Sequence, residues 1–189
     1  MKIYNNTIKS LLEVFPKVDP EEDPLRYYKI PIIRTFYFER IRAVISCLNY
    51  AKSHKGCFNK ILDIGYGSVI LFPYLRDYYN EIYGIDKHGK SMEIEEIFEK
   101  FNIKINLFDG DILEINFEDE FFDCITCISV LDYVKEYDKA INEIYRVLKH
   151  SGILIVGLVV KNSITDLGFS ILNAKTDIYH VATYKEIFK

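Results

Sequence analysis

The sequence "KILDIGYGSVI", residues 60–70, decides the fold that we expect for this chain. Its first five residues are mostly apolar and predict a buried strand. Gly65 and Gly67 follow, and because glycine has no Cβ atom, the backbone can turn sharply there and approach a ligand closely. In open α/β sheets, ligands bind beyond the carboxyl ends of the strands. The stretch therefore predicts a strand that leads into a binding turn.

Strand and helix patterns alternate on both sides of this turn. Further strands are predicted within residues 81–86, 103–111, 121–131 and 153–160, and helices within residues 35–54, 68–78, 91–101 and 136–149. The first helix would be capped by Thr35 and would end before Gly56. The strands are continuous apolar runs, as expected when both faces of a sheet are covered. The sequence therefore predicts an α/β fold: an open, mostly parallel sheet with helices on both faces.

The length and composition indicate one globular domain. The chain has 189 residues, of which 49% are hydrophobic and 28% charged. We expect the domain to cover residues 34–189, after an N-terminal arm over residues 1–33 that carries four of the five prolines and is a candidate pocket cover. The net charge of -4 disfavours a nucleic-acid partner, which usually meets a basic surface.

The apolar runs are too short for a membrane span. The longest, residues 153–160, falls far below the roughly 20 residues that a membrane-spanning helix needs. The first residues lack the continuous apolar core of a signal peptide. We therefore expect a cytoplasmic protein, while the oligomeric state is left open by the sequence.

Two residue pairs are expected to be structural. Cys124 and Cys127 have the C-x-x-C spacing of some zinc and redox sites, but they lie within a predicted strand. Residues three apart on a strand point to opposite faces, so we expect two core cysteines and no metal site. Glu143 and Arg146 are spaced for an i, i+3 pair on the surface of a helix.

An acidic strand end accompanies the glycine turn. Asp86 ends the predicted strand 81–86, and a carboxylate there can accept hydrogen bonds from two ribose hydroxyls. Turn and acid together predict a nucleoside site. A dinucleotide fingerprint would need a third glycine where Ile70 stands, so an NAD-dependent oxidoreductase is a disfavoured alternative.

Four segments, in this order, resemble the class I S-adenosylmethionine-dependent methyltransferases of the type 11-like group. "LDIGYGS" is similar to the D-x-G-x-G first motif, and "YGID" to the second motif with its ribose-binding acid. "FDGDILEINFEDEFFDCI" is similar to the stretch whose acid contacts adenine, and "ISVLDYVKEYDKAINEIYRVLKHSGILIV" to a long motif near the end of the domain. The resemblance covers about residues 36–160. It implies a Rossmann-like methyltransferase domain that binds S-adenosyl-L-methionine.

The resemblance also implies which residues hold the methionine and ribose parts of this cofactor. Asp63 would orient the turn and the methionine amino group. Gly65 and Gly67 would contact the methionine part through their backbone. Asp86 would hold the ribose.

Further residues are implied at the adenine and at the methyl group. Asp111, with the backbone of Ile112, would face adenine, and the neighbouring Asp109 is the rival for this role. Ser129 would lie near the transferable methyl group, largely through its carbonyl.

The chain departs from the family pattern in three places. Val69 stands where a third glycine is usual, so its side chain must fit beside the cofactor or against the sheet. The motif after the fourth strand has Asp132 and Tyr133 in place of the usual histidine. The antiparallel pair of strands that normally follows the fifth strand is expected to be missing or short.

The sequence assigns no catalytic base. Methyl transfer needs a base only when the acceptor carries its proton into the site. Asp132, Tyr133 and His180 are the candidates, in falling order. We expect the remaining histidines at the surface: His54, His88 and His150.

Three functions are compatible with these patterns. The favoured one is an S-adenosylmethionine-dependent methyltransferase with a small-molecule or a sugar- or lipid-linked acceptor, which the sequence does not name. The second is a non-catalytic, methyltransferase-like partner subunit, which Val69 and the short C-terminal region favour. The third is the NAD-dependent oxidoreductase. Cofactor binding discriminates among the three.

Overall fold

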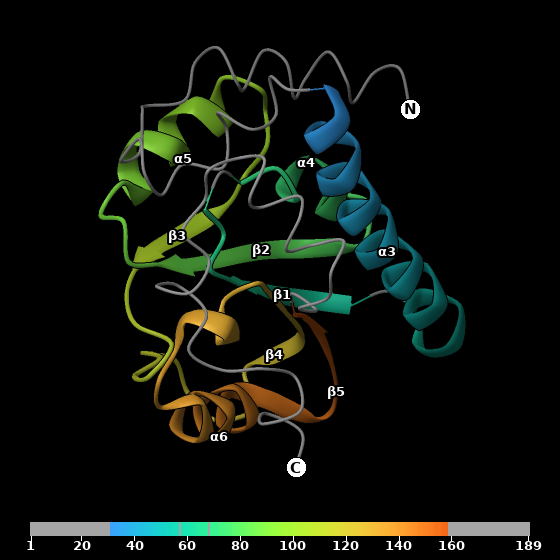
Figure 1. Ribbon diagram of the computed structural model, residues 1–189. Helices are drawn as coiled ribbons and strands as arrows, with labels where there is room; N and C mark the ends of the chain where they lie inside the picture. The colour runs from blue at the N-terminus through green and yellow to red at the C-terminus, as the bar shows by residue number, and fades with distance from the viewer. Residues whose placement is uncertain (1–30, 57, 68, 159–189) are drawn as a thin grey trace.

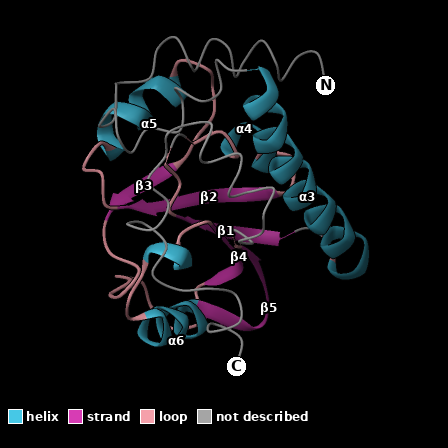
Figure 2. Cartoon of the chain, in the orientation of Figure 1, coloured by secondary structure: helices cyan, strands magenta, loops and turns pink. Residues whose placement is uncertain are grey.

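Five apolar strands pair in parallel within the residues that the structure, a computed structural model, describes: 31–56, 58–67 and 69–158. The strand order is β3-β2-β1-β4-β5. Helices cover both faces of this sheet (Figures 1 and 2). The predicted α/β fold is therefore confirmed, as an all-parallel, Rossmann-like sheet over the described ranges. Most of the predicted arm, the C-terminal strand pair and His180 lie outside these ranges.

The element bounds agree with most of the predicted ranges. The strands are β1 (Phe58–Ile64), β2 (Tyr79–Asp86), β3 (Asn106–Asp109), β4 (Phe122–Ile128) and β5 (Leu148–Gly157). The helices are α3 (Pro31–Lys55), α4 (Phe72–Leu75), α5 (Ser91–Glu99), α6 (Tyr137–Val147) and a 3-10 helix, η1 (Leu131–Tyr133). None of these described helices has both the length and the apolar character that crossing a membrane requires.

Two apolar clusters fill the space on the two faces of the sheet. The first packs α3, α4 and α5 against one face, through residues such as Leu48, Phe72 and Phe98. The second packs the buried stripe of α6 against the other face. Cys124 belongs to the first cluster and Cys127 to the second, so the two thiols are buried on opposite faces as predicted. Figure 1 shows α6 and the short η1 below the sheet and α3, α4 and α5 above it.

Three boundaries differ from the predicted ones. α3 already begins at Pro31, so Thr35 lies inside the helix and does not cap it. α4 has only four residues instead of a helix over 68–78, because the chain still turns at Val69, whose φ is +51°. β5 begins directly after α6, and its register against β4 shifts near Phe122.

Glu143 and Arg146 form the predicted i, i+3 pair and also hold a loop against α6. The Arg146 guanidinium donates to the carbonyls of Ile115 (2.6 Å) and Phe117 (2.7 Å) and to the Glu143 carboxylate (2.9 Å). Glu143 accepts a hydrogen bond from the Ile115 N–H at 2.8 Å. The pair therefore satisfies backbone groups of the segment that leads into β4.

We predict that Arg146→Met lowers the free energy of unfolding by about 2–3 kcal/mol, because the Ile115 and Phe117 carbonyls lose their charged donor. Chemical denaturation measures this change. Arg76→Met is the matched control, since the Arg76–Asp77 pair is wide (3.8 Å) and more than half exposed, and its loss should cost less than about 0.5 kcal/mol. Equal effects of the two substitutions would contradict the assigned role.

Candidate functional site

The glycine turn after β1 is built against two other segments. Gly65 and Gly67 have φ values of +71° and +44°, in the left-handed region that favours glycine. A Cβ atom at Gly65 would lie 2.1 Å from Cγ2 of Val130, which follows β4. The Gly65 N–H donates to the carbonyl of Ile85 at 2.8 Å. The turn is thus fixed between the ends of β2 and β4.

Gly67 has free space beside it within the part of the chain that the structure describes. Among those residues, a Cβ atom there would meet nothing closer than the Gly65 carbonyl oxygen, at 3.9 Å. The described residues therefore leave room for a ligand against the backbone at this position.

Asp86 reaches the glycine turn. Its Oδ2 accepts the Gly67 N–H at 2.8 Å, and its Oδ1 accepts the Lys87 N–H at 2.7 Å. Each carboxylate oxygen can accept a further hydrogen bond. Asp86 can therefore hold the turn and still receive two hydroxyls of a ligand; its role toward a ribose remains a prediction.

Asp63 is a buried carboxyl beneath the turn. Thr126, its register partner on β4, donates to Oδ1 at 2.6 Å. Burial raises the pKa of Asp63 to about 7; the Thr126 hydrogen bond opposes this shift and the charge of Asp86 adds to it. A buried carboxylate of this kind is stabilised by a cation, such as a ligand ammonium group.

Two carboxylates near the end of β3 have different partners. Asp109 accepts the Ser91 hydroxyl at 2.8 Å, which commits it to the start of α5. Asp111 accepts the Leu113 N–H at 2.9 Å and forms an ion pair with Lys87 at 2.9 Å. Asp111 therefore lies beside the loop after β2, which supports it over Asp109 as a ligand group. The next residue, Ile112, is buried.

The end of β4 brings the remaining candidates together. Ser129 has a φ of +56° and donates its N–H to Gly157 at 2.6 Å, while its Oγ accepts from Arg40 of α3 at 2.7 Å. In η1, Asp132 is buried (1% exposed) and Tyr133 is half exposed (48%). Asp132 and Tyr133, the two described candidates for a base, thus lie in the short helix just after Ser129. Of the two, only Tyr133 is open to solvent.

Tyr66 and His88 are site residues that the sequence reasoning missed. Their rings meet edge-on, with centroids 4.8 Å apart, where the turn after β1 faces the loop after β2. The Tyr66 hydroxyl and Nε2 of His88 are buried and have no hydrogen-bond partner among the described residues. His88 as a whole is partly exposed, so the expectation that it lies at the surface is not contradicted, although its Nε2 atom is buried. Tyr66 occupies the variable position between the two glycines, which gave no pattern to detect.

The Tyr66 hydroxyl keeps its proton. Burial, with the nearby carboxylates of Asp86, Asp109 and Glu95, raises its pKa above the ordinary range. Nδ1 of His88 accepts the Lys90 N–H at 3.1 Å, so the proton of the neutral ring lies on Nε2. Two buried donors thus stand beside the turn, and orphaned donors of this kind mark space for a polar ligand or an ordered water.

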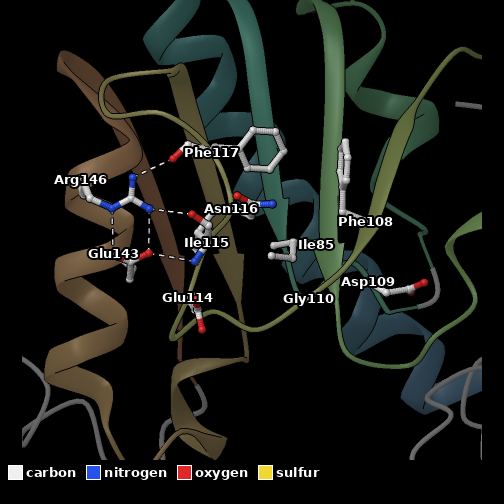
Figure 3. A pocket seen from close by; sticks show the side chains of 10 residues that line it. All are labelled: Ile85, Phe108, Asp109, Gly110, Glu114, Ile115, Asn116, Phe117, Glu143 and Arg146. Atoms are coloured by element: carbon white, nitrogen blue, oxygen red, sulfur yellow. Dashed lines mark hydrogen bonds and ion pairs between the residues drawn. The ribbon is translucent and has the colours of Figure 1, made fainter.

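A cavity of about 680 Å³ opens between α6 and the ends of β2 and β3. Its lining includes Ile85, Asp109, Gly110, Glu143 and Arg146 (Figure 3). Neither Gly65 nor Gly67 lines it. We therefore centre the candidate ligand site on the glycine turn and Asp86, and the cavity borders this site through Ile85 and Asp109.

Comparison with known proteins assigns these features to a family. Residues 62–156 match the family described as "Methyltransferase domain". The match covers the glycine turn, Asp86, the end of β3 and the end of β4.

Individual relatives agree with this match. The uncharacterized protein MJ0638 of Methanocaldococcus jannaschii is 34% identical over 158 residues, which are 83% of this chain and 64% of that protein. The uncharacterized methyltransferase YcgJ of Bacillus subtilis is 28% identical over 65% of this chain and 50% of its own length. The chain thus spans between half and two thirds of these relatives.

Solved structures show the same fold. The crystal structure of YcgJ has a TM-score of 0.52 at 25% identity, and the alignment covers 67% of this chain and 56% of YcgJ. The protein mmp1179 of Methanococcus maripaludis, provisionally described as an S-adenosyl-L-methionine-dependent methyltransferase, has a TM-score of 0.58 at 20% identity, over 87% of this chain and 77% of its own.

We predict that Asp63→Asn stabilises the free protein at pH 8 by roughly 2–4 kcal/mol, and by a clearly smaller amount at pH 5. The folded-state pKa near 7 exceeds the ordinary value of 3.8, so the stability of the native protein is full below pH 4 and is lost as the pH rises through 7. Asparagine carries no charge, so it removes the cost of burying an ionised carboxylate. Its side-chain oxygen can still accept the hydrogen bond from the Thr126 hydroxyl. Thermal unfolding at both pH values measures the effect.

Asp123→Asn is the control with the opposite sign. Burial opposes ionisation of Asp123, but Lys149 and the Lys60 and Asn59 N–H groups overcome it and lower its pKa. This substitution should therefore destabilise the protein at pH 8. A pH-independent effect of Asp63→Asn would refute the buried, raised-pKa carboxyl.

We predict that glycine is tolerated better than alanine at Val69. The valine is fully buried but holds a left-handed backbone, which costs roughly 1–2 kcal/mol for a residue with a Cβ atom. Both substitutions lose the stabilisation that the packed valine side chain contributes, about 1.5–3 kcal/mol. Only glycine also removes the conformational cost of the left-handed backbone. The expected order of unfolding free energies is Val69, then Val69→Gly, then Val69→Ala.

Buried Val44, within helix α3, provides the comparison. At this position the alanine variant should have a free energy of unfolding about 1 kcal/mol higher than the glycine variant, because the backbone is helical. Denaturant titration of the four variants compares the two sites. The same preference at both positions would show that the backbone at residue 69 is not strained.

Proposed function

We propose that this chain, which belongs to the methyltransferase-domain family, is a class I enzyme that transfers a methyl group from S-adenosyl-L-methionine to an acceptor. The proposed acceptor is a small molecule or a sugar- or lipid-linked molecule. The family match supports the methyltransferase domain, and the geometry at the carboxyl ends of the strands supports a site for this cofactor.

One observation carries the proposal: two carboxylates flank an open glycine turn. Buried Asp63 ionises readily only beside a cation, and the cofactor carries an α-ammonium and a sulfonium group. Asp86 is fixed by two backbone N–H groups and keeps acceptor capacity for the ribose hydroxyls. Gly67 leaves room for a ligand against its backbone. The residues present therefore fit this cofactor.

The proposed mechanism asks the protein to bind, to orient and to exclude water. The sulfonium of the cofactor supplies an already activated methyl group. Asp63, Gly65, Gly67 and Asp86 would fix the methionine and ribose parts. Holding two reactants in line can contribute several kcal/mol through effective molarity alone, so the activity does not depend on a strong base.

The acceptor side is proposed at the end of β4. Ser129 would lie near the methyl group, and Arg40 donates to its hydroxyl from α3. If the acceptor needs a base, solvent-accessible Tyr133 and buried Asp132 are the described candidates. His180 remains a third candidate from the sequence.

We predict that S-adenosylhomocysteine raises the thermal unfolding temperature of the chain. At 100 times its dissociation constant, a ligand adds about 2.7 kcal/mol, which for a chain of this size is a shift of roughly 5–11 °C. Asp86→Asn should abolish the shift because the ribose loses its charged acceptor. Glu96→Ala, on the exposed face of α5, should leave it unchanged.

The competing functions give different results in the same experiment. A folded protein that shows no shift would support the non-catalytic partner subunit. A shift with NAD, and none with S-adenosylhomocysteine, would support the oxidoreductase. Asp86→Asn is preferred to Asp86→Ala because it keeps an acceptor for the Gly67 N–H.

A further inference from the structure

Lys87 links the two acids that face the proposed nucleoside. It follows Asp86 directly and donates its backbone N–H to the Asp86 carboxylate at 2.7 Å. Its Nζ lies 2.9 Å from Oδ2 of Asp111, across the gap between the loops after β2 and β3. The sequence motifs drew attention to the two acids and not to the lysine between them.

Each oxygen of the Asp111 carboxylate already has one partner in the absence of a ligand. Oδ1 accepts the Leu113 N–H at 2.9 Å, and Oδ2 pairs with Lys87. Partial burial opposes ionisation, but the Leu113 N–H, Lys87 and the more distant Lys139 together lower the Asp111 pKa. Asp111 is therefore an ionised acceptor with an ammonium donor beside it.

The ion pair can rearrange easily. The side chains of Lys87 and Asp111 are 65% and 39% exposed, and pairs as exposed as this contribute little to stability. A ligand edge that offers both a donor and an acceptor can replace the ion pair without leaving either charge unsatisfied. A ligand that offers only a donor would satisfy Asp111 and displace Lys87 into solvent.

We propose that Lys87 reads the purine base together with Asp111, as a donor beside an acceptor. This inference rests on the proposed function. Adenine would present its 6-amino group to Asp111 and a ring nitrogen to Lys87. Hypoxanthine would present its N1–H to Asp111 and its 6-oxygen to Lys87. A site with Asp111 alone would repel that oxygen, so Lys87 broadens the range of accepted bases.

The test compares S-adenosylhomocysteine with its inosine analogue, S-inosylhomocysteine, by isothermal titration calorimetry. The wild-type protein should bind the two within about tenfold of each other. Lys87→Met should weaken the inosine compound at least tenfold and the adenosine compound at most about threefold. Lys87→Arg, which restores a donor, should recover most of the loss.

Lys139→Met is the matched control. Lys139 lies on α6 and acts on Asp111 through its charge alone, with no hydrogen bond to it. It should leave the ratio of the two affinities unchanged. If the affinity ratio changes equally in the Lys87→Met and Lys139→Met variants, the effect arises from the general positive charge near Asp111. That result would overturn the proposed contact between Lys87 and the base.

The remaining outcomes separate this inference from the proposed function. If Lys87→Met strengthens both compounds equally, the lysine merely competes for Asp111 and the inference is wrong. If the ratio stays constant while S-adenosylhomocysteine binds, the inference fails and the cofactor assignment stands. If a folded wild-type protein binds neither compound, both fail.

Discussion

The turn after β1 depends on its contact with the end of β2, and the rest of the site depends on that turn. β1 and β2 pair in register up to Ile64 and Ile85, so the turn begins where β2 is about to end. The Gly65 N–H then bonds to Ile85, and Asp86 receives the Gly67 N–H. The carboxylate position is thus set by backbone groups on both strands. A side chain at residue 65 would force this junction apart.

Much of this arrangement was predictable from the sequence, because parallel strands buried on both faces must be apolar throughout. That pattern predicts the sheet, and because the carboxyl ends of parallel strands meet at one edge, it also predicts that the turn and Asp86 belong to one site. The short α4 was not predictable. The residues after Gly67 are apolar enough for a helix, but tertiary packing holds Val69 in a left-handed conformation. The contact between the His88 and Tyr66 rings was likewise not predictable, because no local pattern reveals that the two residues are neighbours.

The acids of the site show why residue type alone did not assign roles. Asp63, Asp86, Asp109 and Asp111 all lie at or just beyond strand ends, yet each has a different partner: a threonine hydroxyl, backbone N–H groups, a serine at a helix start and a lysine. Their ionisation and availability follow from these partners. The sequence favoured Asp111 over its neighbour Asp109 for the adenine role, and the fold adds that the two carboxylates have different partners.

The strand order also governs how the chain can assemble during synthesis. β1 borders β4, whose paired residue Thr126 lies 63 positions after Asp63. When the first three strands have left the ribosome, one edge of β1 still has no neighbour. An unpaired apolar edge is a template for association with other chains. The interval before β4 emerges is therefore the period in which a nascent chain most needs a chaperone.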